Sequence, residues 1–363
     1  MLYLVTSDIS ARFLRGQLAH LIERGFEVAV GAGLSDPPAV FDEGVEVHDL
    51  PLVRNPSPLA DLRGLIAVLG LIRRTRPTIV NASTPKAGLL GMIASWLLRV
   101  PKRVYVVRGL RFETANGISR HALRSLERVT TACATDVVYN SRSLLAVAER
   151  ERAVGTGRGV VLAGGSGNGI DAEHFDELPT RHEARRVLGL AHDTKVIGFV
   201  GRLTRDKGIV DLVEAFRSLD DDTVLLLVGD FETGDPVPDT TRRVIENDDR
   251  IVQLPWIDDT RSIYPAIDVL AFPSAREGLP NVPLEAQLCG VPVVAYAATG
   301  TVDAVFPGPP NRSLPVGDRD GLTAALRSSG GGAPSPEPAD WVRRNFDRER
   351  IWGEIERLLG ARS

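Results

Sequence analysis

The residues best suited to chemistry form the stretch Glu277-Gly-Leu-Pro-Asn281-Val-Pro-Leu-Glu285, with an apolar run before it and Gly290 after it. This order predicts a strand, a loop, a short helix that Asn281 caps and Gly290 ends, and a second strand. Such a loop directs free backbone N–H groups and a helix N-terminus at one point, which suits a diphosphate. Phosphate would repel the two glutamates, so we expect them to accept hydrogen bonds from sugar hydroxyls. An ordinary surface loop followed by a capped helix is the alternative.

A second polar stretch, Gly201-Arg202-Leu-Thr-Arg-Asp-Lys207-Gly208, follows a buried apolar run and precedes a helical one. Arg202 and Lys207 lie five residues apart on a strand-to-helix loop, so together they can bracket two phosphates. A solvated surface loop is the alternative. We interpret the stretch as a cationic diphosphate site in the same half of the chain as the two glutamates.

Acidic runs at residues 220–222 and 258–259 raise the question of a metal site. The first run precedes a predicted strand instead of ending one, and the second is typical of a helix cap. We therefore predict no metal site and no metal dependence.

Polar residues also follow three predicted strands of the amino-terminal half. In the first group, Ser10 is expected to cap a helix that begins near residue 11. In the second, Lys86 and free N–H groups at a helix start would form another anion site, although simple capping by Thr84 explains the same residues. The candidate acceptor-side residues are Ser10, Arg12, Thr84, Lys86, Arg108, Arg111 and Glu113.

The elements that must position these residues alternate between apolar strands and amphipathic helices, which predicts a doubly wound parallel α/β fold. The glycine-rich run at 164–171 is unsuited to a stable helix or strand, so we interpret it as a hinge. The amino-terminal strands are expected near 2–6, 26–31, 45–50, 78–81, 103–107, 136–139 and 160–162, with helices near 11–24, 59–75, 86–98, 119–133 and 141–153. The carboxy-terminal strands are expected near 195–200, 223–228, 251–254, 267–272, 292–296 and 313–316.

Length and charge agree with two domains. A chain of 363 residues is long for one core, and 43% hydrophobic with 25% charged residues is typical of a globular protein. Residues 1–165 carry 21 Lys/Arg against 14 Asp/Glu, a net charge of +7, whereas residues 166–363 carry 22 against 33, a net charge of −11, which together give −4. The basic half indicates either an anionic partner, such as a phosphorylated acceptor or a membrane surface, or scattered surface arginines.

The sequence also bears on the compartment. Cys133 and Cys289 are far apart in apolar helical contexts, which is typical of reduced core residues. The first apolar run reaches Thr6 at once, so we interpret it as a strand and not a signal peptide. The apolar helix at 89–98 is too short to cross a bilayer. We expect a cytoplasmic protein; peripheral attachment to the inner face of the cell membrane stays open.

The paired glutamates and the Gly-Arg-x(4)-Lys-Gly stretch resemble the donor motifs of retaining GT-B glycosyltransferases of the family-four type. The resemblance implies two Rossmann-like domains facing a cleft: residues 1–165 for the acceptor and 166–346 for the donor, with residues 347–363 packing back on the first. It also implies that Glu285 binds the ribose and Glu277 lies by the donor sugar. Arg202 and Lys207 would hold the diphosphate.

The same resemblance implies further donor contacts. Backbone groups after the first glutamate would frame the sugar and phosphate, and Trp256 and Ile257 would meet the base, although Trp256 could equally be a packing residue. Many family members have a histidine where this chain has Arg108, so we assign no catalytic histidine. The remaining residues of the implied pocket are Gly201, Gly278, Leu279, Pro280 and Asn281.

Four short sequence segments resemble those of a subgroup of the family that builds bacterial surface polysaccharides on polyprenyl-diphosphate sugars. We therefore expect transfer of a sugar from a nucleotide-diphosphate donor, with UDP as the nucleotide, to a hydroxyl of a lipid-linked acceptor. No cofactor and no nucleic-acid partner are expected. The alternatives are transfer to a soluble natural product or metabolite, nucleotide-sugar epimerisation, and sugar-nucleotide binding without turnover. The four segments begin at Phe13, Thr84, Arg108 and Gly165.

Overall fold

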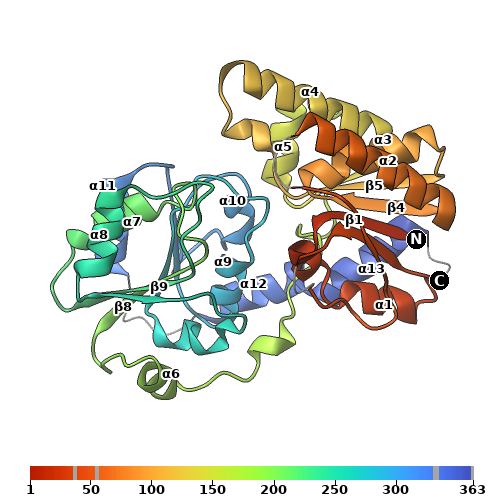
Figure 1. Cartoon of the computed structure of the whole chain (residues 1–363). Helices are drawn as coiled ribbons and strands as arrows, with labels where there is room; N and C mark the ends of the chain where they lie inside the picture. Colours follow the sequence, from red (N-terminus) through yellow and green to blue (C-terminus); the bar gives the residue numbers. More distant parts are fainter. Residues whose placement is uncertain (36–38, 54–56, 330–334, 361–363) are drawn as a thin grey trace. The chain divides into compact units, whose positions relative to one another are not determined.

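The computed structural model describes residues 1–35, 39–53, 57–329 and 335–360 (Figure 1). Contacts divide the chain into two compact units. Unit 1 contains Met1–Gly169 and the chain from Arg348 onward, and unit 2 contains Ile170–Asp347.

Unit 1 is built on a seven-stranded sheet in which every neighbouring pair is parallel. The strand order is β3-β2-β1-β4-β5-β6-β7, so the order reverses between β1 and β4. The strands are β1 (Leu2–Ser7), β2 (Ala29–Gly33), β3 (Glu46–Asp49), β4 (Ile79–Ser83), β5 (Lys102–Val107), β6 (Asp136–Tyr139) and β7 (Gly159–Val160).

Helices cover both faces of this sheet (Figure 1). On one face α2 (Pro58–Thr75), α3 (Pro85–Leu97), α4 (Gly117–Cys133) and α5 (Arg142–Arg150) close one apolar core. On the other, α1 (Gln17–Glu23) and α13 (Arg348–Leu359) close a second core that includes Trp352. The predicted helix near 11–24 is divided, because a 3-10 turn, η1 (Asp8–Leu14), precedes α1. Gly16, with φ of 75°, separates the two.

Unit 2 has a six-stranded parallel sheet in the order β10-β9-β8-β11-β12-β13, which reverses between β8 and β11. Its central strands are almost continuously apolar, apart from Lys195 and Thr223 at their starts, and helices bury both faces. The strands are β8 (Lys195–Val200), β9 (Thr223–Val228), β10 (Ile251–Leu254), β11 (Val269–Phe272), β12 (Val293–Tyr296) and β13 (Arg312–Leu314).

Two helical layers enclose the sheet of unit 2 (Figure 1). One face packs on α7 (Ile209–Arg217), α8 (Asp239–Asn247) and α11 (Arg319–Ser328). The other packs on α6 (Arg181–Val187), α9 (Asn281–Leu288) and α12 (Pro336–Phe346). Short segments complete the unit: η3 (Glu173–Phe175), η4 (Thr260–Ser262), η5 (Tyr264–Ala266) and α10 (Thr301–Ala304).

The predicted class is confirmed, since both units are doubly wound parallel sheets and the strands lie close to their predicted positions. Both cysteines are free and partly buried against apolar cores. Within the described ranges, no helix combines the length and apolar character needed to span a bilayer. In such sheets a ligand binds beyond the carboxyl ends of the strands, where the order reverses. The loops after β8 and β11 occupy that place in unit 2.

Candidate active site

The two predicted donor stretches meet at the carboxyl edge of the sheet of unit 2. Lys207 follows β8 and Glu277 follows β11, the two strands that flank the reversal of strand order. Lys207 Nζ lies 2.5 Å from Glu277 Oε1, and Ser274 Oγ donates to the same oxygen at 2.8 Å. A cation and a carboxylate 70 positions apart in sequence are thus in direct contact.

Close backbone packing brings these loops together. Gly208, the residue before α7, has φ of 74°, and a Cβ there would lie 2.1 Å from the carbonyl oxygen of Pro273. Gly300 has φ of 78°, and a Cβ there would lie 2.7 Å from the carbonyl oxygen of Glu277. The Glu277 N–H donates to the Thr299 carbonyl at 2.9 Å. Only glycine fits both places, so the two glycines fix the positions of Lys207 and Glu277.

Arg202 lies in the same loop as Lys207 and is held by acidic partners. Its Nη1 forms an ion pair with Glu232, and its Nη2 lies 3.8 Å from Asp206 Oδ2. The Arg202 side chain is 37% exposed, so its guanidinium remains accessible to a ligand. Burial raises the pKa of Asp206, but the Thr204 hydroxyl and nearby cations outweigh it and hold that pKa below its ordinary value. The loop therefore presents the two cations Arg202 and Lys207 beside the ionised, hydrogen-bonded carboxylate of Asp206.

The helix after the donor loop begins one residue earlier than a cap at Asn281 requires. Asn281 is the first residue of α9, the preceding residue is Pro280, and no side chain caps the helix. The predicted cap is therefore wrong, because Pro280 takes the extended conformation of the capping position. The predicted stop is confirmed, since Gly290 has φ of 71° directly after the last helical turn. The uncapped N–H groups of the first turn suit an anion.

Glu285 lies on α9 and belongs to a hydrogen-bonded group that sequence reasoning missed. Tyr264 OH donates to Glu285 Oε2 at 2.7 Å, and Thr260 Oγ1 donates to the same oxygen at 3.2 Å. Burial raises the pKa of Glu285 despite these hydrogen bonds. No motif marks Tyr264 or Thr260, since they reach Glu285 only through the fold.

The two candidate base contacts differ in exposure. Trp256 lies between β10 and η4 and is 46% exposed, and its Nε1 donates to Asp258 at 3.1 Å. Ile257 packs against the core that contains α9. Trp256 is therefore not a core residue, and its ring is accessible for stacking. Asp259 caps η4 by accepting a hydrogen bond from the Arg261 N–H, as its predicted role required.

A metal centre would need a cluster of ligands. In the part of the chain that the structure describes, no three His, Cys, Asp or Glu side chains lie together in a way that could hold a metal ion. Metal independence of this protein stays a prediction.

On the acceptor side, Thr84 and Lys86 are engaged within unit 1. Thr84 does not cap α3, because its Oγ1 lies 2.7 Å from Thr6 Oγ1 and accepts from the Thr6 N–H at 3.2 Å. Lys86 Nζ lies 2.5 Å from Asp61 Oδ1. The strand ends of β1 and β4 are thus joined across the point where the strand order reverses. Simple capping by the Thr84 side chain, one of the two sequence interpretations, is therefore wrong.

Ser10 also departs from its predicted role. It lies within η1 and is partly exposed, so it does not cap a helix that begins near residue 11. The side chain of Arg12 lies outside the described part of the structure.

The third predicted group is divided between the interior and the surface of unit 1. Arg108 stacks over the ring of Phe13 at 4.7 Å and donates to the Phe13 carbonyl at 3.3 Å. Burial lowers the pKa of Arg108 to about 10. Arg111 is exposed on a 3-10 turn, and Glu113 is partly buried on the same turn. The three side chains therefore differ in burial.

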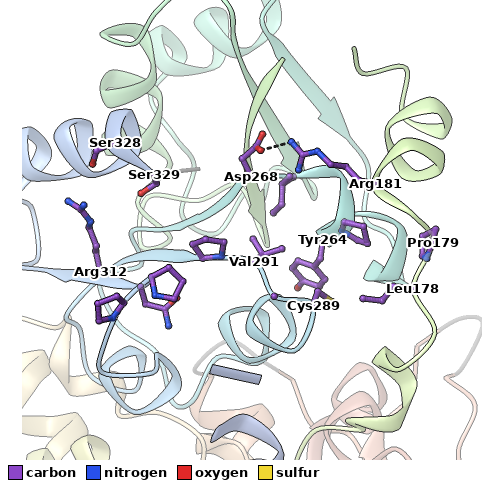
Figure 2. A pocket seen from close by; sticks show the side chains of 17 residues that line it. Leu178, Pro179, Arg181, Tyr264, Asp268, Cys289, Val291, Arg312, Ser328 and Ser329 are labelled. Atoms are coloured by element: carbon purple, nitrogen blue, oxygen red, sulfur yellow. Dashed lines mark hydrogen bonds and ion pairs between the residues drawn. The ribbon is translucent and has the colours of Figure 1, made fainter. Parts of the chain in front are cut away.

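A pocket of about 600 Å³ in unit 2 lies at the opposite, amino edge of the sheet (Figure 2). Residues before β11, β12 and β13 line it, including Asp268, Val291 and Asn311, together with Arg312 at the start of β13. Asp268 pairs with Arg181 at its rim. No predicted donor residue lines this pocket, although the ring of Tyr264 does. The predicted donor residues lie instead at the carboxyl edge, where the cations, carboxylates and helix N-terminus meet.

Comparison with known proteins agrees with this architecture. Residues 10–165 match the model described as a glycosyl transferase 4-like domain, and residues 194–329 match glycosyl transferases group 1. The chain is 31% identical to the capsular polysaccharide biosynthesis glycosyltransferase CapM of Staphylococcus aureus over 99% of this chain and 96% of that protein. It is 29% identical to the UDP-Gal:alpha-D-GlcNAc-diphosphoundecaprenol alpha-1,3-galactosyltransferase of Escherichia coli over 72% of this chain and 68% of that protein. The fold is similar to that of sucrose-phosphate synthase from Thermosynechococcus elongatus, with a TM-score of 0.79 at 22% identity, covering 100% of this chain and 99% of that one.

Proposed function

We propose that this chain, which belongs to the GT-B glycosyltransferases with group 1 and 4-like domains, transfers a sugar from a UDP-sugar to a lipid-diphosphate-linked acceptor with retention of configuration. The observation that carries the donor part is the convergence of Arg202, Lys207, Glu277 and the start of α9 at one sheet edge. Two cations and a helix N-terminus suit a diphosphate, and a carboxylate beside them suits sugar hydroxyls.

The proposed donor pose follows from these contacts. Arg202 and Lys207 would neutralise the diphosphate, and Glu277 would accept hydrogen bonds from the donor sugar. Glu285 would accept from the ribose through Oε1, since Tyr264 and Thr260 both donate to Oε2. The exposed ring of Trp256 would stack on the base.

The proposed chemistry uses the leaving group as the base. The bond from the anomeric carbon to the diphosphate oxygen breaks, and the acceptor oxygen bonds to the same face of that carbon. The acceptor proton passes to a diphosphate oxygen. Arg202, Lys207 and the N–H groups of α9 stabilise the charge that develops on the diphosphate. No enzyme nucleophile is required.

The acceptor part rests on the relatives and on the surface of unit 1. One relative is named for capsular polysaccharide biosynthesis and another for a diphosphoundecaprenol-linked sugar. Of the 18 large hydrophobic side chains exposed among the described residues, 14 belong to unit 1, which also contains the whole of the basic half, residues 1–165. This combination suits an anionic lipid surface.

A donor screen tests the proposed function. The protein is incubated with UDP-sugars and a polyprenyl-diphosphate-linked sugar, and the anomeric configuration of the product is read by NMR. Transfer with retention supports the proposal, and transfer with inversion contradicts the mechanism. Incubation without acceptor distinguishes the rivals: slow hydrolysis indicates a transferase, a new epimer indicates an epimerase, and binding with neither indicates a sugar-nucleotide-binding protein.

Flotation with anionic liposomes tests membrane attachment. We expect binding at low salt that weakens at high salt, because a Debye length of about 8 Å at physiological ionic strength screens surface charge. No binding at low salt, together with efficient transfer to a water-soluble acceptor without a diphosphate, would favour a soluble natural product as the acceptor.

A further inference from the structure

Unit 1 contains a second cavity, of about 710 Å³, that none of the predicted acceptor residues lines. It lies beyond the carboxyl ends of β1, β2 and β3 and against α2, and we call it the α2 pocket. Its volume is within the usual range for small-molecule sites. Its polar lining includes Ser7, Ser35, Asp49 and Arg63.

The walls of the α2 pocket are fixed by the fold. Asp8 is fully buried, and its Oδ2 accepts from the Ser35 N–H at 2.9 Å, from Ser35 Oγ at 2.8 Å and from the Ala39 N–H at 2.8 Å. Asp49 Oδ1 accepts from the Leu34 N–H at 3.2 Å. A Cβ on Gly33 would lie 2.5 Å from the Leu52 carbonyl oxygen. The pocket is therefore preformed.

The polar residues of the pocket suit two different chemical groups, a phosphate and a sugar. Arg63 is exposed on α2 and lines the pocket, whereas the nearby acid Asp61 is paired with Lys86. An arginine that lines a pocket suits a phosphate. The exposed carboxylate of Asp49 and the hydroxyls of Ser7 and Ser35 suit sugar hydroxyls.

An apolar stripe continues from the pocket along α2. Leu59, Leu62 and Ile66 are 73%, 55% and 60% exposed, and their spacing of three and four residues places them on one side of the helix. Arg63 lies between them in sequence. The opposite side of α2 packs into the core through Val68 and Leu71. The helix is thus apolar on both sides, which is unusual for a surface helix in contact only with water.

We propose that the α2 pocket is the acceptor site and takes a sugar joined through phosphate to a lipid chain. The sugar contacts Ser35 and Asp49, the phosphate contacts Arg63, and the lipid chain lies along the stripe of Leu59, Leu62 and Ile66. This inference rests on the proposed function, because it assigns the acceptor of that reaction. The order of polar, cationic and apolar groups matches the order of sugar, phosphate and lipid in one molecule.

The experiment compares two variants with two matched controls. Arg63→Gln removes the cation of the pocket, and Arg150→Gln removes an exposed arginine on α5 of the same unit. Ile66→Gln interrupts the stripe, and Ile118→Gln changes an isoleucine on α4 that is 89% exposed. All four side chains are exposed, so the variants are expected to fold, and their melting temperatures check this.

Three acceptors carry the same N-acetylglucosamine: one on a polyprenyl diphosphate in detergent micelles, one on a methyl diphosphate, and one as a methyl glycoside. Arg63→Gln is expected to raise KM about 10-fold or more for both diphosphate acceptors, since a hydrogen bond to a charged group is lost. It should leave KM for the methyl glycoside and the rate of UDP-sugar hydrolysis unchanged. Ile66→Gln should raise KM for the polyprenyl acceptor alone, and the two controls should change none of these values.

Two results would contradict the assignment of the α2 pocket as the acceptor site. One is an equal effect of Arg63→Gln and Arg150→Gln on the diphosphate acceptors. The other is an equal effect of Arg63→Gln on all three acceptors, which would show that the arginine does not contact phosphate. If the wild-type protein transfers to neither diphosphate acceptor, the proposed function is wrong and the pocket assignment is wrong with it. If the wild-type protein transfers to the diphosphate acceptors and Arg63→Gln does so equally well, only the assignment of the α2 pocket is wrong.

Discussion

Unit 1 and unit 2 have closely related sheets, but the residues at the point where the strand order reverses differ between them. In unit 2 the loops after β8 and β11 present Lys207 against Glu277. In unit 1 the corresponding strands, β1 and β4, are joined by the contact between Thr6 and Thr84, and Lys86 is paired with Asp61. The same topology therefore forms the candidate donor site in one unit and joins two strand ends in the other.

The two units also differ in how many large hydrophobic side chains they expose. Unit 2 exposes four large hydrophobic side chains among its described residues, and one of them, Trp256, lies between β10 and η4. Unit 1 exposes 14, with Leu59, Leu62 and Ile66 in one stripe. Under the proposed function, unit 2 recognises a compact, charged donor and unit 1 recognises an extended, apolar acceptor. A water-soluble donor and a lipid-linked acceptor would require this division.

The largest effect is expected in the cationic loop of unit 2. Arg202→Ala should lower kcat by about 10²–10³, which corresponds to roughly 2.7–4 kcal/mol, by analogy with the loss of an oxyanion donor. Arg205→Ala is the matched control, because Arg205 is exposed in the same loop and its Nε donates to the Pro236 carbonyl. Steady-state kinetics with a saturating UDP-sugar measures both. Equal losses in the two variants would contradict a specific role for Arg202.

A buried acid of unit 1 should affect stability and not chemistry. Glu127 is buried on α4, and burial raises its pKa from 4.5 to about 7, against a hydrogen bond with Tyr105. The folded protein therefore binds a proton that the unfolded chain releases, so the free energy of unfolding falls as pH rises between about 4.5 and 7. The difference corresponds to on the order of 3 kcal/mol.

Glu127→Gln should remove that part of the pH dependence, because the amide does not ionise. Unfolding measured at pH 5 and pH 8 should show a smaller loss of stability in the variant than in the wild type. UDP affinity should be the same in both proteins. An unchanged pH dependence would show that Glu127 does not titrate in this range.

The two glutamates of unit 2 should separate binding from turnover. Glu285→Ala should weaken UDP binding by roughly 1.5–3 kcal/mol, the range for hydrogen bonds to a charged group. Glu277→Ala should leave UDP binding nearly unchanged and lower turnover with an intact UDP-sugar. Calorimetric titration with UDP and steady-state kinetics measure the two effects. If UDP binds equally well to the wild type and to Glu285→Ala, the ribose assignment is wrong.

The smallest effect is expected on removal of metal ions, which tests whether side chains alone supply the positive charge of the donor site in unit 2. Treatment with EDTA should leave the transfer rate unchanged, because Arg202, Lys207 and the start of α9 supply the charge for a diphosphate. The rate is measured before and after chelation, and again with added magnesium or manganese. Loss of activity with EDTA that either metal restores would contradict this prediction.

The sequence by itself determined the fold class and the donor motifs of this protein. Buried parallel strands are continuous apolar runs, and the helices between them repeat with a period near 3.6, so local composition reveals both. Arg202 with Lys207, and Glu277 with Glu285, each lie on one loop and helix. Residues within a few positions of one another have their geometry fixed by local backbone structure.

Only the tertiary structure decided which partners complete these groups. Tyr264 and Glu285 are 21 residues apart, and Lys207 and Glu277 are 70 apart. Arg63 and Asp49 line one pocket only because α2 packs against the segment that follows β3. The same holds for Thr84 and Lys86, whose partners Thr6 and Asp61 come from other elements. A side chain takes the nearest complementary group that the fold supplies, and local sequence does not specify which residue from a distant element that will be.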